Sequence, residues 1–194
     1  MKNIRYNICF LFLLCFFRLP GKAIVATDHT QISVLTCAPG NELYSLFGHT
    51  SIRVECPENA LDIVFNYGTF DFHTEHFYLK YAQGLLPYQL SVTSYESFIR
   101  SYVFDNRSVW SQKLLLDVRQ KQHLLDLLTD NYKPENRTYL YNFLYDNCST
   151  RVRDIIDECG NKEILWHVPN RHKSFWSLLD EYLDVSYTNL TLPT

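Results

Sequence analysis

Cys148 and a histidine far upstream of it are the two side chains of this sequence best suited to covalent chemistry. Apolar residues recur at helical spacing between Cys148 and Gly160, which predicts a helix that begins at the cysteine. Asp146 or Asn147 is predicted to cap it. The positive end of a helix dipole favours the thiolate, the nucleophilic form of cysteine. The alternative interpretation is a buried cysteine that serves as a small apolar residue. The presence of His49 favours a catalytic role for Cys148 over a structural one, because an imidazole can take a proton from the thiol and return it.

The strand that begins near the histidine is predicted to pair with the next strand along the chain. Alternating apolar residues indicate strands over 50–54 and 61–67, joined by a turn-rich segment. A hairpin centred between residues 57 and 58 gives each strand one apolar face and sets Arg53 opposite Asp62. These opposite charges support the register, which a slip of one residue would undo.

The same register sets Asn66 opposite His49, where an amide can orient the imidazole for proton transfer. Asn66 can equally be a strand residue that bonds its own backbone. Asp71 and His73, in the loop after the second strand, are the competing orienting groups. Backbone N–H groups in the first turn of the Cys148 helix would face an oxyanion formed at the sulfur. The residues therefore predict a thiol nucleophile, a histidine base and an orienting amide or carboxylate.

Other polar and aromatic residues give weaker candidates for a site. His29 and His123 are expected at the surface, whereas His167 and His172 flank a turn and are a minor candidate for lining a site. Three acidic residues are explained as the solvated face of a helix: Asp154, Asp157 and Glu158. Five residues suggest either an acyl groove or ordinary core: Tyr78, Tyr81, Leu85, Leu86 and Tyr88.

Composition suits a single globular domain. The chain has 194 residues, of which 46% are hydrophobic and 20% charged, with a net charge of −3. That charge and the lack of a basic run give no support to nucleic-acid binding. The spacing of histidines and cysteines matches no zinc site, so no metal or cofactor is expected.

Residues 1–23 are predicted to be a signal peptide. Lys2 and Arg5 precede an apolar run over 8–17, and small residues at 21–23 offer a cleavage site, with Ala26 as an alternative. The run is too short to span a bilayer comfortably, so residues 24–194 are expected to be exported as one domain.

Export leaves four cysteines in an oxidising compartment. Cys37 and Cys56 flank the histidine strand, and we expect that they could form a disulfide. Cys148 and Cys159 cannot pair, because the helix between them would hold them about 16 Å apart.

The remaining segments alternate between strand and helix patterns. Further strands or extended segments are predicted over 32–37, 88–92, 109–116 and 139–144, and helices over 77–82, 95–103, 119–129 and 174–185. This order predicts an α+β fold with one mostly antiparallel sheet packed against helices.

Four motifs in this order resemble the Lnb N-terminal periplasmic domain family. They lie at 36–40, 46–50, 64–72 and 145–152, and the resemblance runs from about residue 32 to 185. It implies a permuted papain-like fold of the NlpC and lecithin:retinol acyltransferase type, in which the histidine precedes the cysteine.

The resemblance also implies an activity, that of a periplasmic lipoprotein N-acyltransferase. Such an enzyme passes an acyl chain from a phospholipid, through a cysteine thioester, to the amino group of a lipoprotein, and works at a membrane surface. Carried over, Cys148 would be the nucleophile and His49 the general base and acid, with Asn66 or Asp71 as the orienting group. Phospholipid and lipoprotein are then the expected partners.

Two alternatives remain open at this point. A cysteine amidase or peptidase on cell-wall peptides uses the same side chains with water as the acceptor. Members of the family usually continue past the last predicted helix, and this chain ends at Thr194. A truncated, inactive binding domain is therefore the other alternative.

Overall fold

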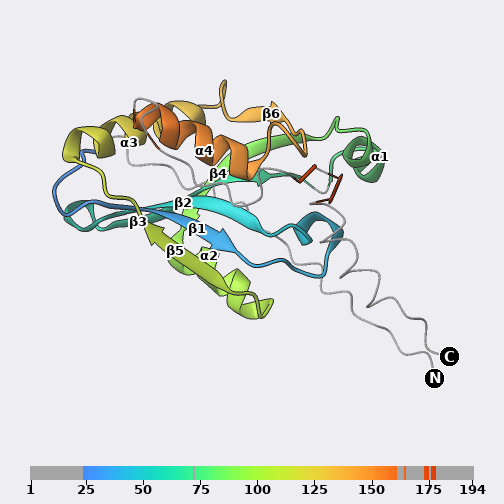
Figure 1. The fold of residues 1–194 in the computed structure, drawn as a ribbon, viewed down its shortest axis with the longest axis horizontal. Coiled ribbons are helices and arrows are strands. Elements are labelled where there is room, and N and C mark those ends of the chain that lie inside the picture. The colour runs from blue at the N-terminus through green and yellow to red at the C-terminus, as the bar shows by residue number, and fades with distance from the viewer. Residues whose placement is uncertain (1–23, 72, 161–163, 165–172, 175, 178–194) are drawn as a thin grey trace.

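A computed structural model describes residues 24–71, 73–160, 164, 173, 174, 176 and 177 (Figure 1). Within them, six strands form one sheet in the order β5-β1-β2-β3-β4-β6, and every neighbouring pair is antiparallel. The strands are β1 (Gln31–Cys37), β2 (His49–Cys56), β3 (Leu61–Thr69), β4 (Pro87–Ser94), β5 (Val109–Lys113) and β6 (Thr138–Leu140). The α-helices are α1 (Phe77–Ala82), α2 (Tyr95–Phe104), α3 (Val118–Tyr132) and α4 (Cys148–Cys159). The predicted α+β class and antiparallel sheet are confirmed.

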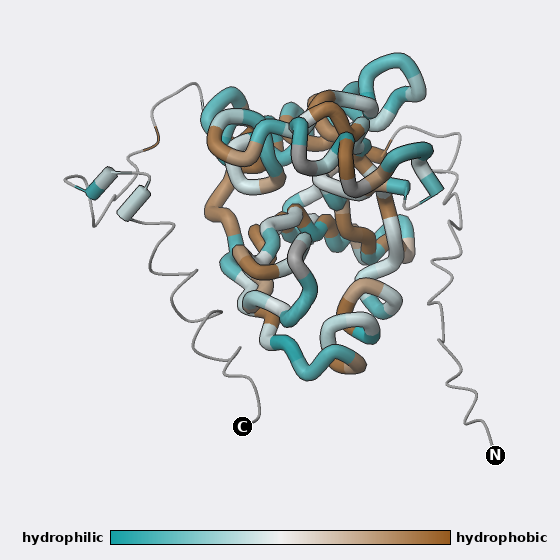
Figure 2. Tube along the Cα trace, turned by 90° about the vertical axis from the view of Figure 1, so that its right-hand side faces the viewer, coloured by the Kyte–Doolittle hydropathy of each residue, from teal (hydrophilic) through white to brown (hydrophobic). Residues whose placement is uncertain are grey.

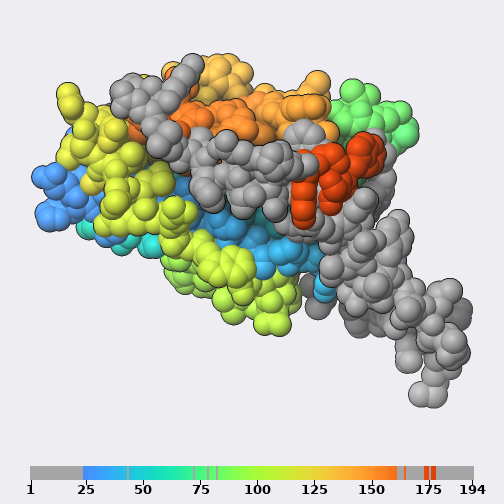
Figure 3. Space-filling model, in the orientation of Figure 1, coloured from blue at the N-terminus to red at the C-terminus, as the bar shows by residue number. Residues whose placement is uncertain are grey.

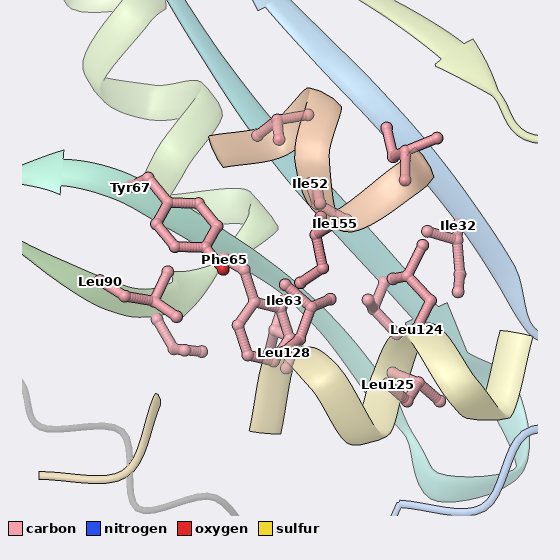
Figure 4. Close-up of a cluster of buried hydrophobic side chains, with 14 of the residues drawn as sticks. Ile32, Ile52, Ile63, Phe65, Tyr67, Leu90, Leu124, Leu125, Leu128 and Ile155 are labelled. Atoms are coloured by element: carbon pink, nitrogen blue, oxygen red, sulfur yellow. The ribbon is translucent and has the colours of Figure 1, made fainter. Parts of the chain in front are cut away.

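Helices cover both faces of the sheet. α3 and α4 lie on one face and α2 on the other, while α1 lies beyond one end of the strands (Figure 1). The larger core fills the space under α3 and α4, where Ile52 and Phe65 of the strands point toward Leu128 and Ile155 of the helices (Figure 4). Figure 2 shows hydrophobic stretches of chain running through the middle of the molecule and hydrophilic stretches at several outer turns.

Helix α4 begins and ends where the sequence predicts. The side chain of Asn147 accepts hydrogen bonds from the backbone N–H groups of Ser149 and Thr150, and the Thr150 hydroxyl accepts from the backbone N–H of Asn147. This reciprocal cap provides acceptors for three backbone N–H groups that would otherwise have no partner at the start of the helix. Gly160 follows the last turn. Asn147, rather than Asp146, is therefore the cap.

The predicted pairing of β2 with β3 is wrong by two residues. The structure pairs Arg53 with Val64 and Glu55 with Asp62, because residues 57–60 form a longer connection than a tight two-residue turn. Pro57 opens a 3-10 turn there, and Ala60 closes it with a left-handed backbone, φ 48°. A shift of two keeps each side chain on its predicted face, since strand side chains alternate with a period of two.

Other boundaries differ modestly from the predictions. β5 stops at Lys113, and β6 stops at Leu140, after which the chain turns before α4. The predicted helix over 119–129 is longer at both ends, and the one over 77–82 has the predicted bounds. The signal peptide over 1–23 and most of the predicted helix over 174–185 lie outside the described residues.

The cysteine pair suggested for a disulfide is not bonded. Cys37 and Cys56 are both free and buried. Cys37 lies opposite His49 at one end of β2, and Cys56 is the last residue of that strand. Seven residues of strand separate those two positions by about 23 Å, whereas a disulfide needs Cα atoms within about 7 Å.

Candidate active site

Three elements meet at one end of the sheet and bring Cys148, His49 and Asn66 together. Cys148 is the first residue of α4, His49 the first of β2, and Asn66 lies in β3. The Cys148 and His49 side chains lie side by side, since both come within 3.8 Å of the Cβ position at Gly68, and each shifts the pKa of the other. His49 Nε2 is hydrogen-bonded to Asn66 Oδ1, which leaves the other ring nitrogen for the sulfur. The thiol, the base and the orienting amide predicted from the sequence are thus in contact.

The contact between His49 and Asn66 is diagonal across the hairpin. In the observed register Asn66 falls nearest Ser51, whose hydroxyl lies 3.4 Å from the same amide oxygen. Diagonal neighbours on one face of a sheet remain within reach of long side chains. The shift of two residues therefore changed the partner directly opposite His49 but kept the predicted pair.

A bulge in β3 lies directly beside the cysteine and the histidine. Pairing with β4 shifts by one residue between Asn66 and Thr69. Gly68 lies in this bulge with φ +91°, and a Cβ there would lie 3.7 Å from the Cβ of Cys148 and 3.8 Å from the Cε1 of His49. Bulges recur beside active sites because they redirect side chains. Here the bulge brings the β3 backbone next to the Cys148 and His49 side chains.

The turn before α4 is tied down by charge and by backbone pairing. Asn142 and Asp146 exchange two backbone hydrogen bonds of 2.9 Å each. Arg151 reaches back along the first turns of the helix and binds both carboxylate oxygens of Asp146, at 2.6 and 2.9 Å. A bidentate pair of this kind fixes geometry as well as adding energy. The start of α4, and with it Cys148, is held in place.

Electrostatics at the site favour an ion pair between sulfur and imidazole. Burial by itself would raise the pKa of Cys148, but the hydrogen bond and charge of His49, the Thr50 N–H and the Ser149 hydroxyl lower the pKa to about 7. Burial by itself would lower the pKa of His49, yet the contacts with Cys148 and Asn66 raise it above its ordinary value. Each partner stabilises the charged form of the other, which is what an activated thiol needs.

One backbone donor of the helix start is left for a substrate. The Asn147 side chain takes the N–H groups of Ser149 and Thr150, and its carbonyl takes that of Arg151. The Cys148 N–H makes no hydrogen bond within the described part of the chain. Of the first-turn donors expected to hold an oxyanion, this one is therefore available.

The competing candidates lie elsewhere. The Asp71 carboxylate is exposed and binds the backbone and ring of His73, whose own side chain is 89% exposed, so neither of them orients His49. His29 and His123 are exposed, as expected. His167 and His172 lie outside the described residues.

The suggested acyl groove divides between core and surface. Leu86 and Tyr88 are buried, Tyr81 is half-buried and Leu85 is exposed. The side chain of Tyr78 lies outside the described part. Tyr88 nevertheless belongs to the surroundings of Cys148, because its ring stacks on Tyr141 in the segment that leads to α4. Sequence patterns missed Tyr141, which sits in a short irregular stretch with no periodicity to mark it.

Residues 20–179 match the Lnb N-terminal periplasmic domain. The chain belongs to this family. The match covers every residue of the cluster just described, and the family's description indicates a periplasmic protein. No curated protein and no solved structure matches. Among the residues that the structure describes, no helix combines the length and the apolar composition needed to cross a bilayer.

Proposed function

We propose that this member of the Lnb N-terminal periplasmic domain family is an exported thiol acyltransferase of the Cys-His type, with a permuted papain-like fold. The contact of Cys148 with His49, itself held by Asn66, is the observation that carries the proposal. The chain order, with the histidine ahead of a cysteine at a helix start, is the one that the permuted fold requires. Acyl groups from phospholipid, passed to the amine of a lipoprotein at the membrane surface, are the substrates we propose.

The reaction begins when His49 takes the thiol proton of Cys148. The thiolate attacks the ester carbonyl carbon of a phospholipid, a C–S bond forms, and the carbonyl electron pair moves to oxygen. The carbonyl then re-forms, the C–O bond breaks, and the leaving alkoxide takes the proton from His49. In the second half an amine attacks the thioester carbon, a C–N bond forms, and His49 takes a proton from the nitrogen. The C–S bond then breaks and His49 gives that proton to sulfur. Asn66 keeps the imidazole ring in position through both halves.

The proposal is tested by looking for the thioester. The protein is incubated with phosphatidylethanolamine vesicles and its mass is measured intact and after digestion. We expect one added acyl chain on Cys148, and its loss on addition of a diacylated lipopeptide with a free amine, which gains the chain. Cys148→Ala and His49→Gln abolish the adduct. Cys159→Ala, which removes a buried thiol at the far end of the same helix, is the matched control and keeps it.

Two other results would contradict the proposal. Release of stem fragments from cell-wall peptide without any acyl adduct would make water the acceptor and the protein a hydrolase. A folded protein that forms no acyl adduct and hydrolyses no cell-wall peptide would be a binding domain.

A further inference from the structure

We propose that the hydroxyl of Tyr141 donates the second hydrogen bond to the oxyanion formed at Cys148, beside the backbone N–H of Cys148 itself. The inference rests on the proposed function, since it assigns a catalytic residue to that reaction. An oxyanion site is normally built from two or more donors. The start of α4 supplies one, because the Asn147 side chain and carbonyl occupy the next three N–H groups.

Backbone pairing places Tyr141 close to the start of α4. Asn142 pairs with Asp146 in an isolated antiparallel bridge. Continuing that pairing by one residue sets Tyr141 across from Asn147, the residue directly before Cys148. Tyr141 and Cys148 also pack against the same hydrophobic core. The segment that leads into α4 (orange in Figure 3) lies next to α1 (green). In agreement, a Cβ on Gly84, two residues past the end of α1, would lie 3.8 Å from the Tyr141 carbonyl oxygen.

Neighbouring rings hold the tyrosine in one orientation. The Tyr141 ring stacks on Tyr88 with centroids 4.3 Å apart and 23° between the planes. Tyr88 is fixed in turn by Phe70, which meets it edge-on at 5.1 Å. Tyr88 is buried in the core and Tyr141 is half-buried. A ring stacked in this way presents its hydroxyl in a defined direction, as preorganised catalysis requires.

The Tyr141 hydroxyl is available, unlike those of Tyr67, Tyr102 and Tyr139. Tyr67 is buried and accepts a hydrogen bond from Asn131 at 2.9 Å, and Tyr102 is buried in the same core cluster as Cys37 under α2. The Tyr139 hydroxyl has no hydrogen-bond partner among the described residues and is closed off from solvent. The Tyr141 hydroxyl makes no hydrogen bond within the described residues, and it does not belong to the closed-off group. Unlike the Tyr139 oxygen, it is therefore not sealed off from solvent by the described residues.

The hydroxyl also stays protonated, which a donor must be. Burial, together with the nearby Cys148 and Tyr81, raises the pKa of Tyr141 well above its ordinary value. The side chain is therefore a neutral O–H donor near pH 7, where the Cys148 thiolate forms. When the thiolate attacks the ester carbonyl, the negative charge forms on the carbonyl oxygen. That oxygen accepts hydrogen bonds from the Tyr141 hydroxyl and the Cys148 N–H, and neither donor gives up its proton.

The test separates stabilisation of the oxyanion from formation of the thiolate. Acylation of Cys148 by p-nitrophenyl octanoate is measured as release of p-nitrophenolate. Inhibition by decanal is measured as well, because the hemithioacetal that decanal forms with Cys148 carries its oxygen where the oxyanion would lie. Alkylation of Cys148 by iodoacetamide needs the thiolate but develops no oxyanion. Tyr141→Phe keeps the ring stack and removes only the oxygen. Tyr139→Phe is the matched control, since it removes a hydroxyl that makes no hydrogen bond.

We expect Tyr141→Phe to lower kcat for acylation about 100-fold with little change in KM, and to weaken decanal inhibition. Its iodoacetamide rate stays at the wild-type value, and Tyr139→Phe matches wild type throughout. Equal acylation by wild type and Tyr141→Phe would overturn the inference and leave the acyltransferase proposal intact. An equal loss of alkylation and acylation would also overturn it, by assigning Tyr141 to the thiolate. A wild-type protein that is alkylated but never acylated would overturn both.

Discussion

Three of the cysteines show how much the surroundings of a thiol decide its chemistry. Burial raises the pKa of Cys37 to about 11, and burial also raises the pKa of Cys159. Cys148 is largely enclosed as well, yet its pKa is lowered to about 7, because an imidazole, a backbone N–H and a hydroxyl face its sulfur. Of these three, only Cys148 gains thiolate character, and it is the one that contacts a histidine.

Alkylation across pH tests this assignment. The rate of iodoacetamide labelling at Cys148 rises as the thiol ionises, so in wild type we expect its midpoint near pH 7. Removing the imidazole in His49→Gln takes away the group that stabilises the thiolate, so the midpoint moves upward by on the order of 1 unit or more. Peptide mass mapping from about pH 5 to pH 10 gives both curves. Coincident midpoints in the two proteins would contradict the ion pair.

The orienting group is tested by comparing two substitutions. Asn66→Ala removes the hydrogen bond to His49 Nε2, and we expect the rate of acylation by p-nitrophenyl octanoate to fall by on the order of 100-fold. Asp71→Ala is the control, because that carboxylate binds His73 at the surface, and its rate stays within about twofold of wild type. A larger loss in Asp71→Ala than in Asn66→Ala would reverse the assignment.

At the scale of single elements, sequence reasoning succeeded where the signal is local and failed where two segments had to be aligned. The start of α4 follows from an amide cap and an apolar period, both readable in a few residues. The register of β2 and β3 does not follow from such local signals. Arg53 binds Asp62 at 2.7 and 2.8 Å although the two are not directly opposite, because a long guanidinium side chain reaches a diagonal partner. The ion pair thus fits both registers and could not choose between them.

The β3 bulge is equally hidden from pattern reading, and it supplies a prediction for this scale. Gly68 and Gly84 both have positive φ, at +91° and +67°, so an alanine at either is expected to cost about 1 kcal/mol of stability in urea unfolding. Only at Gly68 does the new Cβ approach Cys148 and His49. We expect Gly68→Ala, but not Gly84→Ala, to slow iodoacetamide labelling of Cys148. Equal labelling rates in the two variants would show that the bulge does not set the Cys148–His49 contact.

At the scale of the whole molecule, the site depends on contacts between segments remote in the chain. His49 and Asn66 come from neighbouring strands of the sheet, whereas Cys148 arrives on a helix that packs across β2 and β3 through Val152, Ile155 and Ile156. The sequence predicts each residue's element, and chemistry predicts that a thiol and an imidazole belong together. The crossing of α4 over the sheet comes from packing of the entire core, which no local pattern encodes.

The same global arrangement overturns the suggested disulfide and leads to a last prediction. Cys37 and Cys56 looked like a pair because they flank one strand, but a strand holds its two ends apart by its full length. Cys37 instead joins the core under α2, and Cys56 contacts Thr30 at the opposite end of the sheet, with 3.4 Å between sulfur and oxygen.

Differential alkylation of the full chain distinguishes the two arrangements. The protein is unfolded in N-ethylmaleimide without reductant, then reduced and labelled with iodoacetamide. Because about 23 Å of strand separates the two thiols, we expect both peptides to carry the maleimide label, as Cys159 does. An iodoacetamide label shared by Cys37 and Cys56 would require the two ends of β2 to meet. That cannot happen while His49 stays beside Cys148, so such a result would count against the candidate site as well as against the sheet.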